Sequence, residues 1–153
     1  HMPENFTRMF AERLNGLCQI TVKEAEHNDP ILPGHAYIAP GGVQSEVRRI
    51  PEGLQLRVFP PGSGDLYAPS VDRLFNTASA ACGDRLIAVI MTGMGDDGAE
   101  AIRGVHQRGG RTIAESSESA IIFGMPAEAI RTGAIDEVLP LSQIPGALRR
   151  LCG

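Results

Sequence analysis

The chain has 153 residues, of which 42% are hydrophobic and 21% charged, and its formal net charge is −4. This composition is typical of one globular domain and excludes a collagen-like or low-complexity disordered chain. An acidic chain with 5% aromatic residues also argues against nucleic-acid binding. Such binding needs Lys and Arg against the phosphates and usually aromatic rings for base stacking.

The cysteines Cys18, Cys82 and Cys152 are odd in number, far apart and in no CxxC arrangement. They indicate free thiols in a reducing compartment. No apolar segment follows a charged start as in a signal peptide, and no apolar run approaches the ~20 residues that span a bilayer. We therefore expect a cytoplasmic protein without direct membrane insertion.

In the first half of the chain, apolar residues at helical spacing predict a helix over residues 6–17. An apolar-rich run predicts a strand over 18–22, and a second strand is expected over 35–39 between two Pro-Gly turns. Residues 43–49 and 54–59 flank a Pro-Glu-Gly turn, which predicts a β-hairpin.

The second half alternates strands and helices. Ser70 is expected to cap a helix that ends before Gly83. The continuous apolar run 86–91 is typical of a strand buried on both faces. A helix over 99–107 and a strand over 111–115 follow.

The last part of the chain continues this alternation. A helix is expected to begin at Pro126, and a final strand over 135–139 precedes a helix that Ser142 would cap. The alternation predicts an α/β fold of the three-layer, doubly wound type, with a mostly parallel sheet and a small antiparallel hairpin. The strands 86–91 and 135–139 should then lie in the same sheet.

The strongest local motif follows the strand 86–91. Gly93, Gly95 and Gly98 satisfy the pattern GxGxxG, and Glu115 and Glu118 lie roughly 20 residues further on, where a ribose-binding acid would stand. This pattern permits a Rossmann-type nucleotide-binding module. However, two carboxylates, those of Asp96 and Asp97, occupy the place where a pyrophosphate would meet the helix N-terminus, and they would repel it.

Asp96 and Asp97 are open to three other interpretations. They could bind magnesium, because hard cations prefer carboxylate oxygens, although no third acid is near in sequence. They could cap the following helix. Alternatively, one of them orients a catalytic histidine while the glycine-rich backbone donates to an oxyanion. The composition singles out none of the four histidines.

Several short motifs in the same order along nearly the whole chain resemble the catalytic domain of the chemotaxis-receptor protein-glutamate methylesterases. They are His1-Met2-Pro3, Phe6-Thr7, Phe10-Ala11, Arg13-Leu14-Asn15, Pro33-Gly34-His35-Ala36-Tyr37-Ile38-Ala39-Pro40, Pro69-Ser70-Val71-Asp72, Thr92-Gly93-Met94-Gly95-Asp96-Asp97-Gly98-Ala99 and Phe123-Gly124-Met125-Pro126.

The resemblance implies hydrolysis of glutamyl methyl esters, and deamidation of glutamines, by a Ser-His-Asp triad. It places the catalytic histidine on His1, the triad aspartate on Asp97 and a backbone oxyanion donor on Met94. It implies no metal and no organic cofactor. The implied partners are methylated chemotaxis receptors, the receiver domain of the same protein and the chemotaxis histidine kinase.

The chain departs from the family pattern at two places. It has no Gly-x-Ser-x-Gly-Gly turn, so we expect residues 1–153 to be an incomplete methylesterase domain whose serine-bearing segment and receiver domain lie upstream. The fragment alone should then be inactive. Members also often have a histidine two residues before the proline of the Pro-Ser-Val-Asp motif, where this chain has Tyr67.

Overall fold

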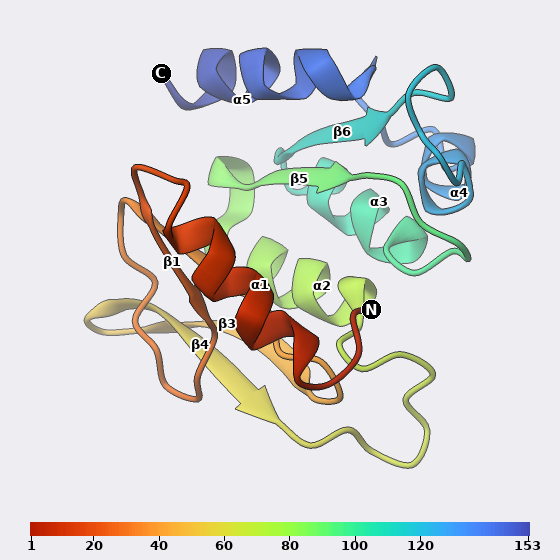
Figure 1. Ribbon diagram of the computed structural model, residues 1–153. Coiled ribbons are helices and arrows are strands. Elements are labelled where there is room, and N and C mark those ends of the chain that lie inside the picture. Colours follow the sequence, from red (N-terminus) through yellow and green to blue (C-terminus); the bar gives the residue numbers. More distant parts are fainter. The chain divides into compact units, whose positions relative to one another are not determined.

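The computed structural model describes residues 1–153, and its secondary structure is drawn in Figure 1. The chain divides into two compact units, residues 1–77 and residues 78–153. No helix combines the length and the apolar character that crossing a bilayer requires.

The first unit contains one complete helix, two pairs of strands and the beginning of a second helix. Its elements are α1 (Phe6–Asn15), β1 (Thr21–Glu24), β2 (His35–Ile38), β3 (Gln44–Ile50) and β4 (Gly53–Phe59). The first two strands pair in parallel, and the last two form the predicted antiparallel hairpin, in which Ile50 pairs with Gly53.

Helix α1 has an unexpected orientation. Its large apolar side chains Phe6 and Met9 are 60% and 67% exposed, whereas Thr7 and Ala11 are buried. The Thr7 hydroxyl donates to Glu24 Oε1 at 2.6 Å, which joins the buried face of the helix to β1. The apolar spacing thus identified the helix but not the face that packs within this unit.

The strand predicted over 18–22 begins later, at Thr21. The backbone N–H groups of Leu17 and Cys18 both donate to the Leu14 carbonyl, so the chain is still closing the helix at these residues. The Thr21 N–H donates to Gly34 O at 3.0 Å and opens the pairing with β2.

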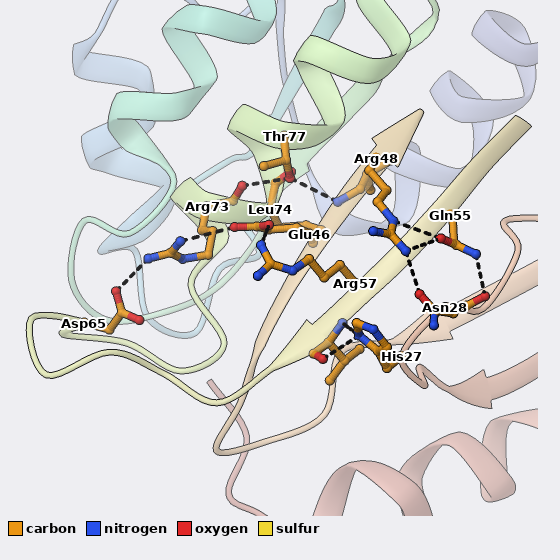
Figure 2. A network of polar contacts seen from close by, with 12 residues as sticks. His27, Asn28, Glu46, Arg48, Gln55, Arg57, Asp65, Arg73, Leu74 and Thr77 are labelled. Carbon is orange, nitrogen blue, oxygen red and sulfur yellow. Dashed lines mark hydrogen bonds and ion pairs between the residues drawn. The ribbon is translucent and has the colours of Figure 1, made fainter. Parts of the chain in front are cut away.

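Helix α2 (Val71–Cys82) begins as the sequence indicated, because the Ser70 hydroxyl accepts from the Arg73 N–H at 3.3 Å. The Arg73 guanidinium lies 2.7 Å from Asp65 and 3.2 Å from Glu46. Figure 2 shows it between these two carboxylates. These ion pairs join the first turn of α2 to the loop before it and to β3. The Gly62 N–H, and then the Arg73 guanidinium, hold the pKa of the Asp65 carboxyl below its usual value.

The second unit has a three-stranded parallel sheet in the order β5-β6-β7. Its elements are the 3-10 turn η1 (Gly83–Arg85), β5 (Ile87–Ile90), α3 (Ala99–Gln107), β6 (Arg111–Glu115), α4 (Met125–Arg131), β7 (Glu137–Leu139), the 3-10 turn η2 (Leu141–Gln143) and α5 (Ile144–Cys152).

Helices cover both faces of this sheet, with α5 on one side and α3 on the other (Figure 1). On the α5 side, Ile113 packs with Ile144 and Ala147, and Ile87 and Val89 add partly buried contacts. The strand predicted over 86–91 is therefore covered on both faces, and the strand predicted over 135–139 shares its sheet. The α/β fold class, with parallel strands and one antiparallel hairpin, is confirmed.

Two local predictions in this unit are wrong in detail. Strand β7 is shorter than 135–139, because the Asp136 carboxylate, rather than a strand carbonyl, accepts from the Thr112 N–H at 2.9 Å. Ser142 does not cap α5. It lies within the preceding 3-10 turn, and the helix starts at Ile144 with a proline in its first turn.

Candidate active site

The connection from β5 to α3 is held through Gly93. The Gly93 N–H donates to Ile122 O at 3.0 Å, and its carbonyl accepts from the N–H groups of Met125 and Gly124 at 2.8 and 3.2 Å. This is an isolated parallel bridge to Phe123, formed outside the named strands. Both sides of one residue are thus fixed by the segment that leads into α4.

The bonds at Gly93 determine the direction of the next amide. The peptide between Gly93 and Met94 is trans, so its N–H points opposite to its carbonyl. Because that carbonyl faces the 124–125 segment, the Met94 N–H faces away from it. The Met94 side chain is 80% exposed, so nothing bulky covers the residue. This geometry suits a backbone donor for an oxyanion.

Glycines allow the close approach that these bonds require. A Cβ on Gly124 would lie 2.6 Å from Gly93 O and 3.2 Å from Met94 Cα, both of them backbone atoms. Gly95 and Gly98 have φ of 94° and 99°, in the left-handed region that favours glycine. The motif that resembles a nucleotide fingerprint is thus explained by packing and turn geometry.

Asp96 and Asp97 differ sharply in environment. Asp96 is exposed and its carbonyl accepts from the Ala99 N–H, whereas Asp97 is 3% exposed. The N-cap of α3 is Gly98, so both aspartates precede the helix. No three His, Cys, Asp or Glu side chains come together as a metal site. A buried carboxylate on the turn that presents Met94 suits an orienting role.

Glu115 lies beneath the same turn at the end of β6. It is 2% exposed, and its two carboxylate oxygens accept from the Thr92 N–H and the Ser119 hydroxyl, both at 2.8 Å. Both oxygens are therefore occupied by the protein, which argues against the ribose-binding role that the GxGxxG pattern suggested. The support that Glu115 gives to the turn was not predicted from the sequence. The one feature of the sequence that points to it is a carboxylate at the end of a strand whose last residues are buried.

His1 belongs to the first unit, where its ring stacks on Tyr67 with centroids 4.8 Å apart and planes inclined by 28°. The other histidines have local structural contacts. Nδ1 of His27 lies 2.8 Å from Val58 O (Figure 2), Nδ1 of His35 lies 3.0 Å from Pro33 O, and Nδ1 of His106 lies 3.3 Å from Asp136. Among these four histidines, only the family resemblance assigns the catalytic role to His1, and that role stays a prediction.

The serines after β6 do not have the surroundings of a nucleophile. The Ser116 hydroxyl is buried without a hydrogen-bond partner, and the Ser119 hydroxyl donates to Glu115. Ser116 has no base beside its hydroxyl, and the Glu115 carboxylate that accepts from Ser119 also accepts from the Thr92 N–H and supports the turn.

Comparison with known proteins identifies the family. The family model described as CheB methylesterase matches residues 1–148. The chain belongs to the CheB methylesterase family. The crystal structure of the Thermotoga maritima CheB methylesterase catalytic domain is similar to it, with a TM-score of 0.94 and 37% sequence identity over 99% of this chain and 80% of that chain.

Curated relatives give the same assignment. A Chromobacterium violaceum protein named protein-glutamate methylesterase/protein-glutamine glutaminase 2 is 51% identical over 150 residues, which are 98% of this chain and 42% of that protein. A Salmonella typhimurium protein-glutamate methylesterase/protein-glutamine glutaminase is 48% identical over 144 residues, 94% of this chain and 41% of that protein. The chain thus spans about two fifths of the length of these relatives.

The three predicted site residues are divided between the two units. Met94 and Asp97 lie on one turn of the second unit, and His1 lies against Tyr67 in the first unit. The roles assigned to these three residues stay predictions.

Proposed function

We propose that this chain forms part of a serine hydrolase that removes methyl esters from glutamyl side chains of chemotaxis receptors and deamidates receptor glutamines. The names of the relatives from Chromobacterium violaceum and Salmonella typhimurium, at 51% and 48% identity, support this substrate class. The family model over residues 1–148 supports the esterase chemistry.

In this proposal His1 is the general base, Asp97 orients its imidazole, and the Met94 N–H donates to the oxyanion. The nucleophilic serine lies outside residues 1–153, upstream of His1. The pinned Gly93–Met94 peptide is the observation that carries the proposal. A preorganised donor of this kind stabilises the charge that develops on an ester carbonyl oxygen during attack.

The chemistry proceeds through an acyl-enzyme. The serine oxygen attacks the ester carbonyl carbon as His1 takes the hydroxyl proton, and the Met94 N–H donates to the oxyanion. Collapse of this tetrahedral intermediate breaks the bond to the methoxy oxygen, which leaves as methanol with the proton from His1. Water then attacks the acyl group with His1 again as base, releasing the glutamate carboxyl and the free serine.

The buried Asp97 carboxylate would favour the protonated imidazole that forms in each half-reaction and hold the reactive tautomer. An aspartate kept away from water by its turn retains one orientation, which a solvent-exposed neighbour such as Asp96 does not.

The family resemblance extends the proposal to partners and location. We infer that methylated receptors are the substrate, that a receiver domain in the same protein and the chemotaxis histidine kinase act with this domain, and that the protein works in the cytoplasm. The thiols Cys18, Cys82 and Cys152 are all free, which fits a reducing compartment.

The test measures methanol release from methylated receptor by a protein that joins this chain to its serine-bearing segment. Wild type should release methanol, and His1→Gln should lower kcat by roughly 10⁴-fold, because the serine loses its base. Wild-type protein that folds but releases no methanol, or a His1→Gln variant with full activity, would contradict the proposal.

Residues 1–153 alone provide a second test. They should show no turnover above background on the same receptor, because a triad without its nucleophile retains only residual catalysis. Methanol release at the rate of the serine-containing protein would place the nucleophile within these residues.

A further inference from the structure

The ring contact between His1 and Tyr67 has no role in the mechanism above. We propose that Tyr67 is a positioning residue, whose ring fixes the plane of the His1 imidazole for proton transfer. This inference rests on the proposed function of His1. The ring centroids are 4.8 Å apart and the planes are inclined by 28°, a stacked arrangement of the kind that aromatic pairs prefer.

The segment that carries Tyr67 is held by a buried amide. Gln44 is completely buried, and its Nε2 donates to Tyr67 O at 2.7 Å while its Oε1 accepts from the Ser70 N–H at 3.0 Å. One side chain thus binds the backbone on both sides of the intervening dipeptide. A buried amide with both ends bonded is costly to displace, so the backbone position of Tyr67 is well defined.

A glycine turn connects this segment to the one that carries His1. The Gly42 N–H donates to Ala68 O at 3.1 Å. On the neighbouring residue, a Cβ on Gly41 would lie 2.5 Å from Met2 O, so the chain after His1 passes directly over this glycine. The Gly41 N–H also donates to the buried Thr7 hydroxyl at 3.1 Å, which ties the turn to α1. The same turn therefore contacts the backbone next to both stacked rings.

The arrangement gives the His1 imidazole a defined orientation although the residue itself is exposed. An exposed histidine without a ring contact would sample several side-chain rotamers, and only some of them face a nucleophile. Misplacing a catalytic group by about 1 Å can cost ~10²-fold in rate. We expect the loss of the Tyr67 ring to lower kcat by about 10-fold, with KM little changed, because the proposed role of the ring is to orient His1 rather than to bind substrate.

Other aromatic rings at residue 67 should also stack on the His1 imidazole. Tyr67→His and Tyr67→Phe should therefore keep the positioning, whereas Tyr67→Leu should remove it. If Tyr67 only stabilised the fold, its replacement by Leu would leave the orientation of the His1 ring the same as its replacement by Phe or His.

The first experiment is proton NMR of the 153-residue chain, which needs no activity. Protons of a ring stacked on Tyr67 experience its ring current, so the His1 ring resonances should lie upfield of those of an unstacked histidine. They should move downfield in Tyr67→Leu and keep their upfield shift in Tyr67→Phe. Unchanged His1 resonances in a folded Tyr67→Leu variant would overturn the inference.

The second experiment measures methanol release by the serine-containing protein. Tyr67→Leu should lose about 10-fold in kcat. Tyr67→Phe and Tyr67→His should recover most of that loss. Leu66→Ala is the matched control, because Leu66 is the neighbouring residue, is 92% exposed and should have no effect.

The two proposals fail in different ways. Inactive wild type, or full activity in His1→Gln, contradicts the proposed function. An active wild type that requires His1 but is indifferent to Tyr67→Leu contradicts only the positioning role of Tyr67.

Discussion

Two glycine turns of this molecule use close packing for different purposes. The turn at residues 40–42 in the first unit lets Gly41 lie against the backbone of Met2, and the neighbouring His1 is proposed to act through its side chain. The turn at 92–98 in the second unit lets Gly124 lie against Gly93. This contact fixes the peptide whose N–H, that of Met94, is the proposed oxyanion donor.

The difference affects how each region should respond to mutation. At 92–98 the functional group belongs to the packed backbone, so a displacement of the backbone displaces the donor directly. At 40–42 the proposed functional group is the His1 imidazole, which belongs to a side chain and not to the packed backbone. The Tyr67 ring, which stacks on the imidazole, is a second support. Substitutions at the second turn should therefore cost more activity than equivalent substitutions at the first.

The largest expected effect is that of Asp97→Asn, which tests whether the second turn also contributes a side chain. Kinetics of the serine-containing protein should show a loss of up to ~10⁴-fold in kcat, because the amide no longer stabilises imidazolium or fixes the reactive tautomer. The free energy of unfolding should change by only about 1 kcal/mol, since the amide has nearly the same size as the carboxylate.

Asp96→Asn is the matched control, because Asp96 is adjacent but exposed. It should keep nearly full activity. If Asp97→Asn lowers the melting temperature strongly and keeps its specific activity, Asp97 has a structural role only. If Asp96→Asn is the inactive variant, the correspondence with the family is displaced by one residue.

Alanine substitutions at Gly124 and Gly93, which contact each other, should lower kcat by different amounts. A Cβ at residue 124 would lie 2.6 Å from Gly93 O, a backbone atom, and would displace the turn at 92–98 that carries the Met94 N–H. Gly124→Ala should therefore lower kcat by about 10²–10³-fold, the usual cost of losing one oxyanion donor. A Cβ at residue 93 would meet the flexible end of Met125, at Sδ, so Gly93→Ala should cost less. Equal losses in kcat would mean that the turn is not held by this backbone contact.

A smaller loss is expected at the first turn. In Gly41→Ala the new methyl group would meet Met2 O at 2.5 Å and Pro3 C at 2.6 Å, which displaces the segment bearing His1. The expected decrease in kcat is at most ~10²-fold. A flexible side chain on a displaced backbone can still adopt some rotamers that bring the imidazole near its working position. Gly64→Ala, with no atom within 4 Å of its Cβ, is the control and should behave as wild type. A Gly41→Ala effect larger than that of Gly124→Ala would reverse the comparison.

The smallest effect concerns pH and involves no catalytic residue. The pKa of Asp65 is held below its ordinary value of 3.8 by the Gly62 N–H, and then by Arg73 (Figure 2). A lowered folded-state pKa stabilises the fold above the ordinary value, and this stabilisation disappears as the pH falls through the folded-state pKa. Asp65→Asn should therefore melt slightly below wild type at pH 7, and the difference should vanish in acid.

Thermal melting at several pH values tests this, with Glu52→Gln at the exposed hairpin turn as the control for replacing a carboxyl by an amide. A difference between wild type and Asp65→Asn that persists unchanged into strong acid would contradict the linkage.

Much of the second unit could be predicted because its signals are local. The apolar run before Thr92, the helix over 99–107 and the strand over 111–115 correspond to β5, α3 and β6. Short connections then required a parallel series, which β5-β6-β7 confirms. The error at β7 occurred where a distant partner replaced a local one, because the Asp136 carboxylate accepts from the Thr112 N–H and the strand is shorter.

The sequence by itself determined the fold class, the order of elements and, through its motifs, the methylesterase family, because periodicity and turn residues act over a few positions. Only the tertiary structure decided that Phe6 and Met9 are exposed on α1, that Glu115 supports the turn at Thr92, and that Tyr67 stacks on His1. These facts depend on contacts between residues more than 20 positions apart or on which face of a helix finds a neighbour. The chemical types of the residues do not specify such contacts until the chain has folded.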